Sequence, residues 1–234
     1  WVAYQLPRDP LHLFDANRYY PETGTLAFTD PMLAISIPVA PIQWLFDNPV
    51  LTLNMAMLLT LALSGYGMYR LVTALTESAL AGAVAGSIFT FNAYRLSHLS
   101  HVNLQSMAFI PLFFLCLSLY LEKGKRHHLI GIGVFLWLVS ASCAYYGVFT
   151  WTVLVVALPY EIWRTGALKR RRQIVALGAT IAVSTVAFLP LALPLMRLRR
   201  DFGFEHPVPR VQRASARPVD YLRSGTHLHR AIGL

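Results

Sequence analysis

The chain has 234 residues, of which 56% are hydrophobic and only 13% are charged, and its mean hydropathy is +0.49. An ordinary soluble domain carries about 25% charged residues, so this composition excludes a polar-surfaced soluble protein. The net charge of +9 does not indicate a nucleic-acid binder, because the basic residues stand at the ends of apolar segments and not among aromatics in a polar domain.

The first 48 residues are predicted to form an extracytoplasmic loop that contains one short apolar segment, residues 32–46. At 15 residues, with prolines at 38 and 41, this segment is too short for a confident span and suits an interfacial or re-entrant helix. Asn48 and Pro49 then provide an N-cap and a first helical residue for the next element. Because the chain starts at Trp1 without a signal-like segment, we expect it to be a fragment of a longer protein.

Residues 49–197 are predicted to form a bundle of transmembrane helices. Windows without Asp, Glu, Lys or Arg cover 22, 34 and 24 residues, and the 34-residue window suits a hairpin of two helices, since one span needs about 20 residues. Residues 78–121 contain a single charge, at Arg95, and divide there into a short and a longer span. The expected fold is therefore an all-α polytopic bundle with about six spans, at residues 48–69, 80–91, 102–121, 127–160 (two spans) and 173–196.

The distribution of lysine and arginine sets the predicted orientation. All three lysines lie in two short loops, residues 122–128 and 164–172, which the positive-inside rule places in the cytoplasm. The hairpin between these loops then turns on the outer side, together with residues 1–48, residues 92–101 and a tail over 198–234. Four polar segments are thus expected to meet on the outer face of the cytoplasmic (inner) membrane, where we expect binding or chemistry.

One of these segments carries a periodic set of polar residues, Tyr94, His98, His101 and Gln105, predicted to share one helix face. Such a face can bind phosphate or sugar hydroxyls, or it can simply lie among lipid headgroups. Two histidines could also ligate a divalent metal, but no local spacing supplies a third ligand, so neither a metal site nor a cofactor is predicted. Arg95 is a site candidate as an isolated charge, either binding a phosphate with its planar fork or reaching the headgroups.

The first loop holds four acidic residues among aromatics. One carboxylate could deprotonate an acceptor hydroxyl while aromatic rings stack on a sugar, although the same acids are also common in turns and caps. We take Asp9, Asp15 and Asp30 as candidate bases. Glu22, with Tyr145 and Tyr146 from the predicted outer turn, completes the candidate substrate-binding set.

Several strings in the chain resemble those of bacterial polytopic membrane proteins related to the C-type glycosyltransferases. They are Leu13 to Glu22, Thr25 to Asp30, Asn48-Pro49-Val50, Leu63 to Tyr69, Tyr94 to His101, Tyr145-Tyr146-Gly147, Ser215-Ala216 and Asp220-Tyr221-Leu222. The resemblance implies a transferase that takes a sugar from a polyprenyl-phosphate carrier and places it on an acceptor outside the membrane. It also implies an acidic base just after a first span. We expect both to precede this chain, which leaves Asp9 or Asp15 as substitutes.

The competing interpretation is a non-enzymatic transporter or lipid-handling protein, in which the same polar face lines a passage. Acidic residues within the spans would favour transport. The uncharged windows contain none, so the transferase is preferred. Both interpretations expect membrane lipids, and no nucleic acid, as partners.

Overall fold

The computed structural model describes residues 1–203 and 207–215, and within those ranges it is helical, without a strand. The chain divides into two units, Trp1–Leu195 and Met196–Leu234, and each is described by itself. The predicted outer tail, residues 198–234, lies in large part outside the described residues. The candidate site belongs to the first unit.

The N-terminal segment folds on itself before the long helices begin. Its short helices are α1 (Val2–Gln5), η1 (Pro10–His12) and η2 (Thr25–Phe28), and α2 (Leu33–Phe46) follows them. Buried side chains of Val2, Leu13 and Leu33 pack together and attach the loop to α2. Helix α2 includes both prolines and starts within one residue of the apolar segment expected at 32–46.

Helices α3 (Pro49–Thr76) and α4 (Ala79–Thr90) form a closely packed antiparallel hairpin. The predicted N-cap of α3 is confirmed, because the side chain of Asn48 accepts a hydrogen bond from the backbone N–H of Leu51 at 3.0 Å. The two backbones meet at glycines: a Cβ on Gly86 would lie 2.7 Å from the carbonyl oxygen of Gly65. Small residues at such positions let membrane helices approach closely.

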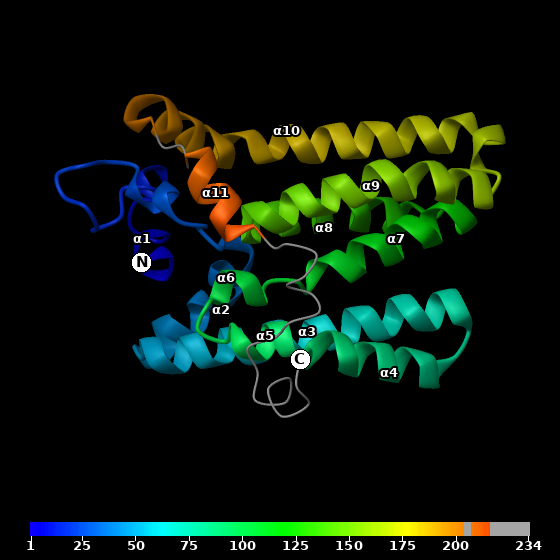
Figure 1. Ribbon diagram of the computed structural model, residues 1–234, viewed down its shortest axis with the longest axis horizontal. Coiled ribbons are helices and arrows are strands. Elements are labelled where there is room, and N and C mark those ends of the chain that lie inside the picture. Colours follow the sequence, from blue (N-terminus) through cyan, green and yellow to red (C-terminus); the bar gives the residue numbers. More distant parts are fainter. Residues whose placement is uncertain (204–206, 216–234) are drawn as a thin grey trace. The chain divides into compact units, whose positions relative to one another are not determined.

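A broken segment connects this hairpin to the centre of the bundle. It contains α5 (Ala93–Ser97) and α6 (Val102–Gln105), and α7 (Phe109–Lys123) follows. Of the candidate spans in the described chain, the stretch Val102–Lys123 is the most buried, at 61%, against 11% for Arg171–Arg197. Helix α7 therefore lies inside the first unit, between α3 on one side and the next two helices of the chain on the other (Figure 1), whereas little of the last long helix is buried.

Helices α8 (Arg126–Ser142) and α9 (Ala144–Arg164) form a second hairpin, which turns at Cys143, next to the predicted turn. Helices η3 (Ala167–Lys169), α10 (Arg171–Phe202) and α11 (Val208–Ala214) complete the described chain. The largest buried cluster joins helices α7 to α10 through apolar side chains that include Phe113, Leu121, Leu136, Leu154 and Leu177. Burial of these side chains holds the four helices together.

The all-helical membrane architecture is confirmed in part. Four helical stretches of the described chain are long and apolar enough to cross a membrane: Pro49–Thr76, Val102–Lys123, Ala144–Arg164 and Arg171–Arg197. The count of about six is not confirmed, because α4 has 12 residues and α8 has 17. A 12-residue helix extends about 18 Å, well short of a hydrocarbon core about 30 Å thick.

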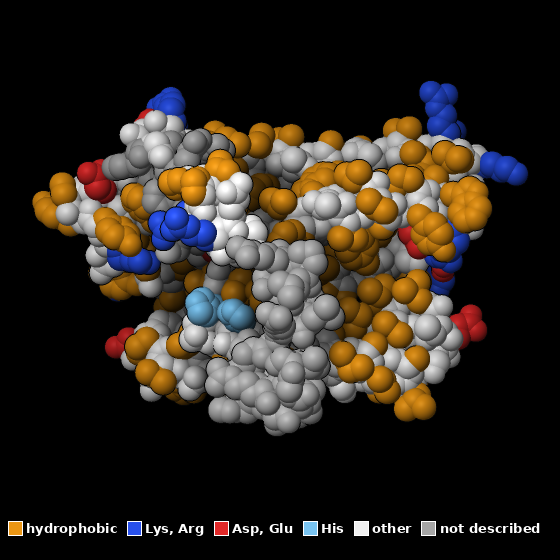
Figure 2. Space-filling view, in the orientation of Figure 1, with side chains coloured by type: hydrophobic (Ala, Val, Ile, Leu, Met, Phe, Trp, Pro, Cys, Tyr) orange, Lys and Arg blue, Asp and Glu red, His pale blue; other side chains and the backbone are white. Residues whose placement is uncertain are grey.

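The surface of these helices suits a hydrocarbon environment. Large apolar side chains are exposed along them, including Val155, Val156 and Val183 at 70%, 73% and 68% exposure. Figure 2 shows that hydrophobic side chains cover much of the visible helical surface, while charged side chains stand mainly near the ends. Soluble monomers rarely expose large contiguous apolar patches.

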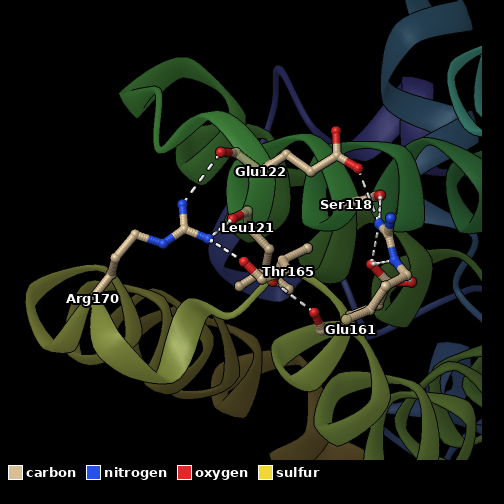
Figure 3. Close-up of polar contacts among 7 residues, drawn as sticks. Ser118, Leu121, Glu122, Glu161, Thr165 and Arg170 are labelled. Atoms are coloured by element: carbon tan, nitrogen blue, oxygen red, sulfur yellow. Dashed lines mark hydrogen bonds and ion pairs between the residues drawn. The ribbon is translucent and has the colours of Figure 1, made fainter.

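A polar network joins the two lysine-containing loops at one end of the first unit. Arg164 forms ion pairs with Glu122 at 3.0 Å and Glu161 at 2.8 Å. Arg170 donates hydrogen bonds to the backbone carbonyls of Leu121, Glu122 and Thr165, which caps the end of α7 (Figure 3). The two loops therefore lie at the same end of the bundle, as their shared assignment to one side of a membrane requires.

Candidate functional site

Asp30 links three segments that are far apart in the sequence. Its Oδ2 accepts a hydrogen bond from the side-chain amide of Asn103 in α6 at 2.9 Å, and its Oδ1 accepts one from the backbone N–H of Ala144 at 3.0 Å. Ala144 is the first residue of α9, so the carboxylate also stabilises the positive end of that helix. The first loop, residues 92–105 and the α8–α9 turn are thereby joined. These are three of the four polar segments that the sequence predicted to meet.

Arg95 is fully buried, at 0% exposure, and is held by Gln105. Its Nε donates to the side-chain Oε1 of Gln105 at 3.1 Å, and its Nη2 donates to the backbone carbonyl of Gln105 at 2.9 Å. Nη1 has no hydrogen-bond partner among the described residues. Burial lowers the pKa of the Arg95 guanidinium, and the nearby Tyr146 acts in the opposite direction. Arg95 thus supports the site from beneath and does not line an open surface.

Gln105 also explains why the predicted continuous helix face over 94–105 is wrong. Its side-chain amide donates to the backbone carbonyls of Arg95 at 3.1 Å and His98 at 2.8 Å. These bonds satisfy carbonyl groups at the end of α5, so the chain turns between His98 and His101 before α6 begins. Gln105 is buried as a result, while the two histidines stay near the surface.

The two histidines form an imidazole pair with mutually tilted rings next to Tyr94. The ring centroids are 4.5 Å apart for Tyr94 and His98 and 5.6 Å apart for His98 and His101. Figure 2 shows histidine side chains side by side over the α5–α6 segment. His98 Nδ1 lies 2.8 Å from the backbone carbonyl of Tyr94, which can only accept a hydrogen bond. A ring that donates to this carbonyl has a proton on Nδ1, so Nε2 is the nitrogen left to bind a ligand, as an acceptor in the neutral ring and as a donor in the imidazolium.

The two tyrosines at the start of α9 differ in exposure. Tyr146 is buried, and its hydroxyl donates to the backbone carbonyl of Leu104 at 2.7 Å, which fixes α9 against α6. Tyr145 is 62% exposed and is free to contact a ligand. Between α8 and α9, burial raises the pKa of the Cys143 thiol to about 11, so this group stays protonated at neutral pH.

The candidate acids of the first loop have different environments. Asp15 accepts a hydrogen bond from the backbone N–H of Gly24 at 2.6 Å, and Gly24 has a left-handed φ of +69°, so this pair shapes the loop. Glu22 is exposed. Asp9 pairs with His12, with Oδ2 2.7 Å from Nδ1 at the surface. The loop thus provides one carboxylate–imidazole pair, which orients a proton acceptor in the way that general bases require.

A cavity of about 350 Å³ lies between α1, α2 and α3, next to the start of α6. Trp1 and Tyr4 supply aromatic surface, and Ser36, Gln43 and Thr52 supply polar groups. The side chain of Thr52 donates to Gln43 Oε1 at 3.0 Å, which fixes the amide on the cavity wall. Aromatic rings beside oriented polar groups are typical of small-molecule sites.

Two residues of the site were not identified from the sequence. His12 could have been found by its three-residue spacing from Asp9 across Pro10, whereas nothing local in the sequence reveals that Asn103 binds Asp30. Asp30 itself has both oxygens occupied by structural bonds. No group of three or more His, Cys, Asp or Glu residues in the described part of the chain could hold a metal ion.

Comparison with known protein families shows a family model that matches residues 1–203. The matching family is described as a domain of unknown function, DUF6311, and the chain belongs to this family. No curated protein and no solved structure matches the chain.

Proposed function

We propose that this DUF6311 protein is a membrane-embedded glycosyltransferase-like protein that transfers a sugar from a polyprenyl-phosphate donor to an acceptor on the outer side of the cytoplasmic membrane. The observation that carries the proposal is the bonding of Asp30 to Asn103 and Ala144. It joins the acidic first loop to the segment with the imidazole pair and to the start of α9. The lysine-containing loops follow the C-terminal ends of α7 and α9. In this proposal α8 also crosses the bilayer, and α4 crosses it together with the residues that flank this short helix, which gives about six spans.

The transfer step is a direct displacement at the anomeric carbon. The acceptor oxygen forms a bond to this carbon while the bond to the donor phosphate oxygen breaks and its electron pair leaves with the phosphate. The acceptor proton goes to a base of the first loop, for which the Asp9–His12 pair is the best candidate because Asp15 and Asp30 hold backbone groups. His101 donates a hydrogen bond to the leaving phosphate, and His98 donates one from Nε2 as the imidazolium, the form in which both ring nitrogens carry a proton.

Arg95 has a positioning role in this proposal. Its bonds to Gln105 fix the turn that presents both imidazoles, and its charge lies beneath them. A buried guanidinium raises the local positive potential without touching the donor. Tyr94 and the exposed Tyr145 provide aromatic surface for the sugar.

The experiment measures transfer from a radiolabelled polyprenyl-phosphate sugar by membranes that contain the full-length protein. The double variant His98→Ala/His101→Ala should lower turnover by about 100-fold, the usual contribution of proton-transfer and charge-stabilising groups. The matched control is His127→Ala/His128→Ala, which removes another tilted imidazole pair, with centroids 4.0 Å apart, at the start of α8. This control should retain wild-type turnover at equal expression.

Equal turnover in the two double variants would refute the role of the imidazole pair. Donor binding by wild type without any transfer would instead favour the lipid-handling alternative. A donor-binding assay on the same membranes separates these outcomes, because it does not depend on the acceptor.

A further inference from the structure

A long apolar groove runs between α8 and α10, in the first unit and away from the imidazole pair. Its volume is about 700 Å³, and its walls include Leu129, Gly133, Trp137, Thr180, Val183 and Ser184. The α10 residues among them lie in the middle of the candidate span Arg171–Arg197. The groove is therefore at a depth where a bilayer contains hydrocarbon chains.

The two helices that form the groove run in the same direction. Ser184 Oγ donates to the carbonyl of Gly133 at 2.8 Å, and Trp137 Nε1 donates to the carbonyl of Ala187 at 3.2 Å. The residues of these pairs are 51 and 50 positions apart in the sequence. Moving along α8 from Gly133 to Trp137 therefore means moving in the same direction along α10, from Ser184 to Ala187. Both helices consequently begin at the same end, which is the end with the lysine-containing loops.

Each helix places an arginine on its groove side at this end. Arg126 precedes Leu129 and Ile130 by three and four residues, and Arg172 precedes Ala179 by seven, so both arginines continue the groove-lining stripes. Both are exposed, and neither makes a hydrogen bond or ion pair with a described residue. Figure 2 shows Lys and Arg side chains projecting at the end of the unit where α10 begins.

We propose that this groove binds one anionic glycerophospholipid of the surrounding bilayer, with an acyl chain between α8 and α10 and the phosphate between Arg126 and Arg172. An apolar channel with two free guanidinium groups at its mouth is complementary to an acyl chain with an anionic headgroup. Guanidinium groups bind phosphate oxygens through paired charge-assisted hydrogen bonds. Basic pockets between membrane helices on the cytoplasmic side commonly bind anionic lipids in this way. The proposal is independent of sugar transfer.

The test uses Trp137 as a reporter, because it lines the groove and brominated acyl chains quench indole fluorescence on contact. The full-length protein is reconstituted in phosphatidylcholine vesicles with rising mole fractions of brominated phosphatidylglycerol or brominated phosphatidylcholine. The difference between wild type and Trp137→Phe isolates the signal of this one tryptophan. Half-quenching should need about tenfold less brominated phosphatidylglycerol than brominated phosphatidylcholine, since each of the two arginines strengthens the binding of an anionic headgroup several-fold.

Arg126→Gln/Arg172→Gln should remove this preference, so that the two quenching curves coincide. The matched control is Lys125→Gln/Arg171→Gln, which removes the same charge from neighbouring exposed positions off the groove stripe and should keep the preference. If both double variants lost the preference for phosphatidylglycerol, general attraction between the basic protein surface and anionic lipids would explain it. This result would overturn the proposed binding site. Absence of quenching by either lipid would show that protein covers the groove, and this result would also overturn the proposal.

Discussion

Arg95 and Gln105 form a buried pair in which each partner depends on the other. Gln105→Leu should lower the free energy of unfolding by about 2–4 kcal/mol, because it removes the hydrogen bond that the buried Arg95 Nε donates to the Gln105 side chain and the two that this side chain donates to the Arg95 and His98 carbonyls. Adding Arg95→Met should restore much of this loss, since an apolar pair needs no hydrogen bonds. Thermal unfolding in detergent measures both effects.

The exposed His101 provides the control for this pair. His101→Leu, in the same short segment, should change the free energy of unfolding by no more than about 0.5 kcal/mol. If the double variant Arg95→Met/Gln105→Leu lost as much stability as the two single changes added together, the pair would not be coupled.

At the level of single elements, the close contact between α3 and α4 should exclude residues larger than glycine at Gly86. Gly86→Ala should lower the free energy of unfolding by about 1–3 kcal/mol, because the new Cβ would lie 2.7 Å from a backbone oxygen that has no room to move. Gly178→Ala in α10 is the matched control, since nothing lies within 4 Å of its added Cβ. Equal destabilisation by both changes would contradict the packing explanation, because Gly178 has room for a methyl group and helix propensity favours alanine at both positions.

How far the sequence predicts an element depends on whether its cause is local. Runs of apolar residues, the Asn48 cap and the turn near Tyr145 are local signals, and the corresponding helices are present. The break between α5 and α6 depends on Gln105 folding back on Arg95, a contact across ten residues that periodicity does not reveal. In the same way, Asp30 was selected for its chemistry, but its bonds across 73 and 114 residues belong to the tertiary fold.

At the scale of the whole molecule, the proposed orientation can be tested by labelling single cysteines in intact cells. Cysteines introduced at Asn17, Ser100 and Tyr145, all exposed, should react with a membrane-impermeant maleimide from outside. Lys125→Cys and Leu168→Cys should react only after permeabilisation, because the positive-inside rule places their loops in the cytoplasm. Labelling of Lys125→Cys in intact cells would reverse the orientation and move the proposed transfer site to the other side.

The native thiol Cys143 should contribute little background to this experiment. Its side chain is 1% exposed, and its pKa of about 11 leaves roughly one thiolate in ten thousand at pH 7. Raising the pH toward 11 should increase its reactivity about tenfold per pH unit, whereas exposed cysteines with ordinary pKa values level off near pH 9.

Helix α9 is held at both ends, by Asp30 at Ala144 and by Glu122 at Arg164. Its 21 residues extend about 31 Å, so this single helix connects the two ends of the first unit. Pro159 lies inside this helix, five residues before the end held by Arg164, and lacks the N–H that would continue the backbone ladder. If ligand binding displaces the Asp30 end, we expect α9 to bend at Pro159 while the Arg164 end stays anchored, which makes this proline the hinge between the proposed reaction site and the basic end.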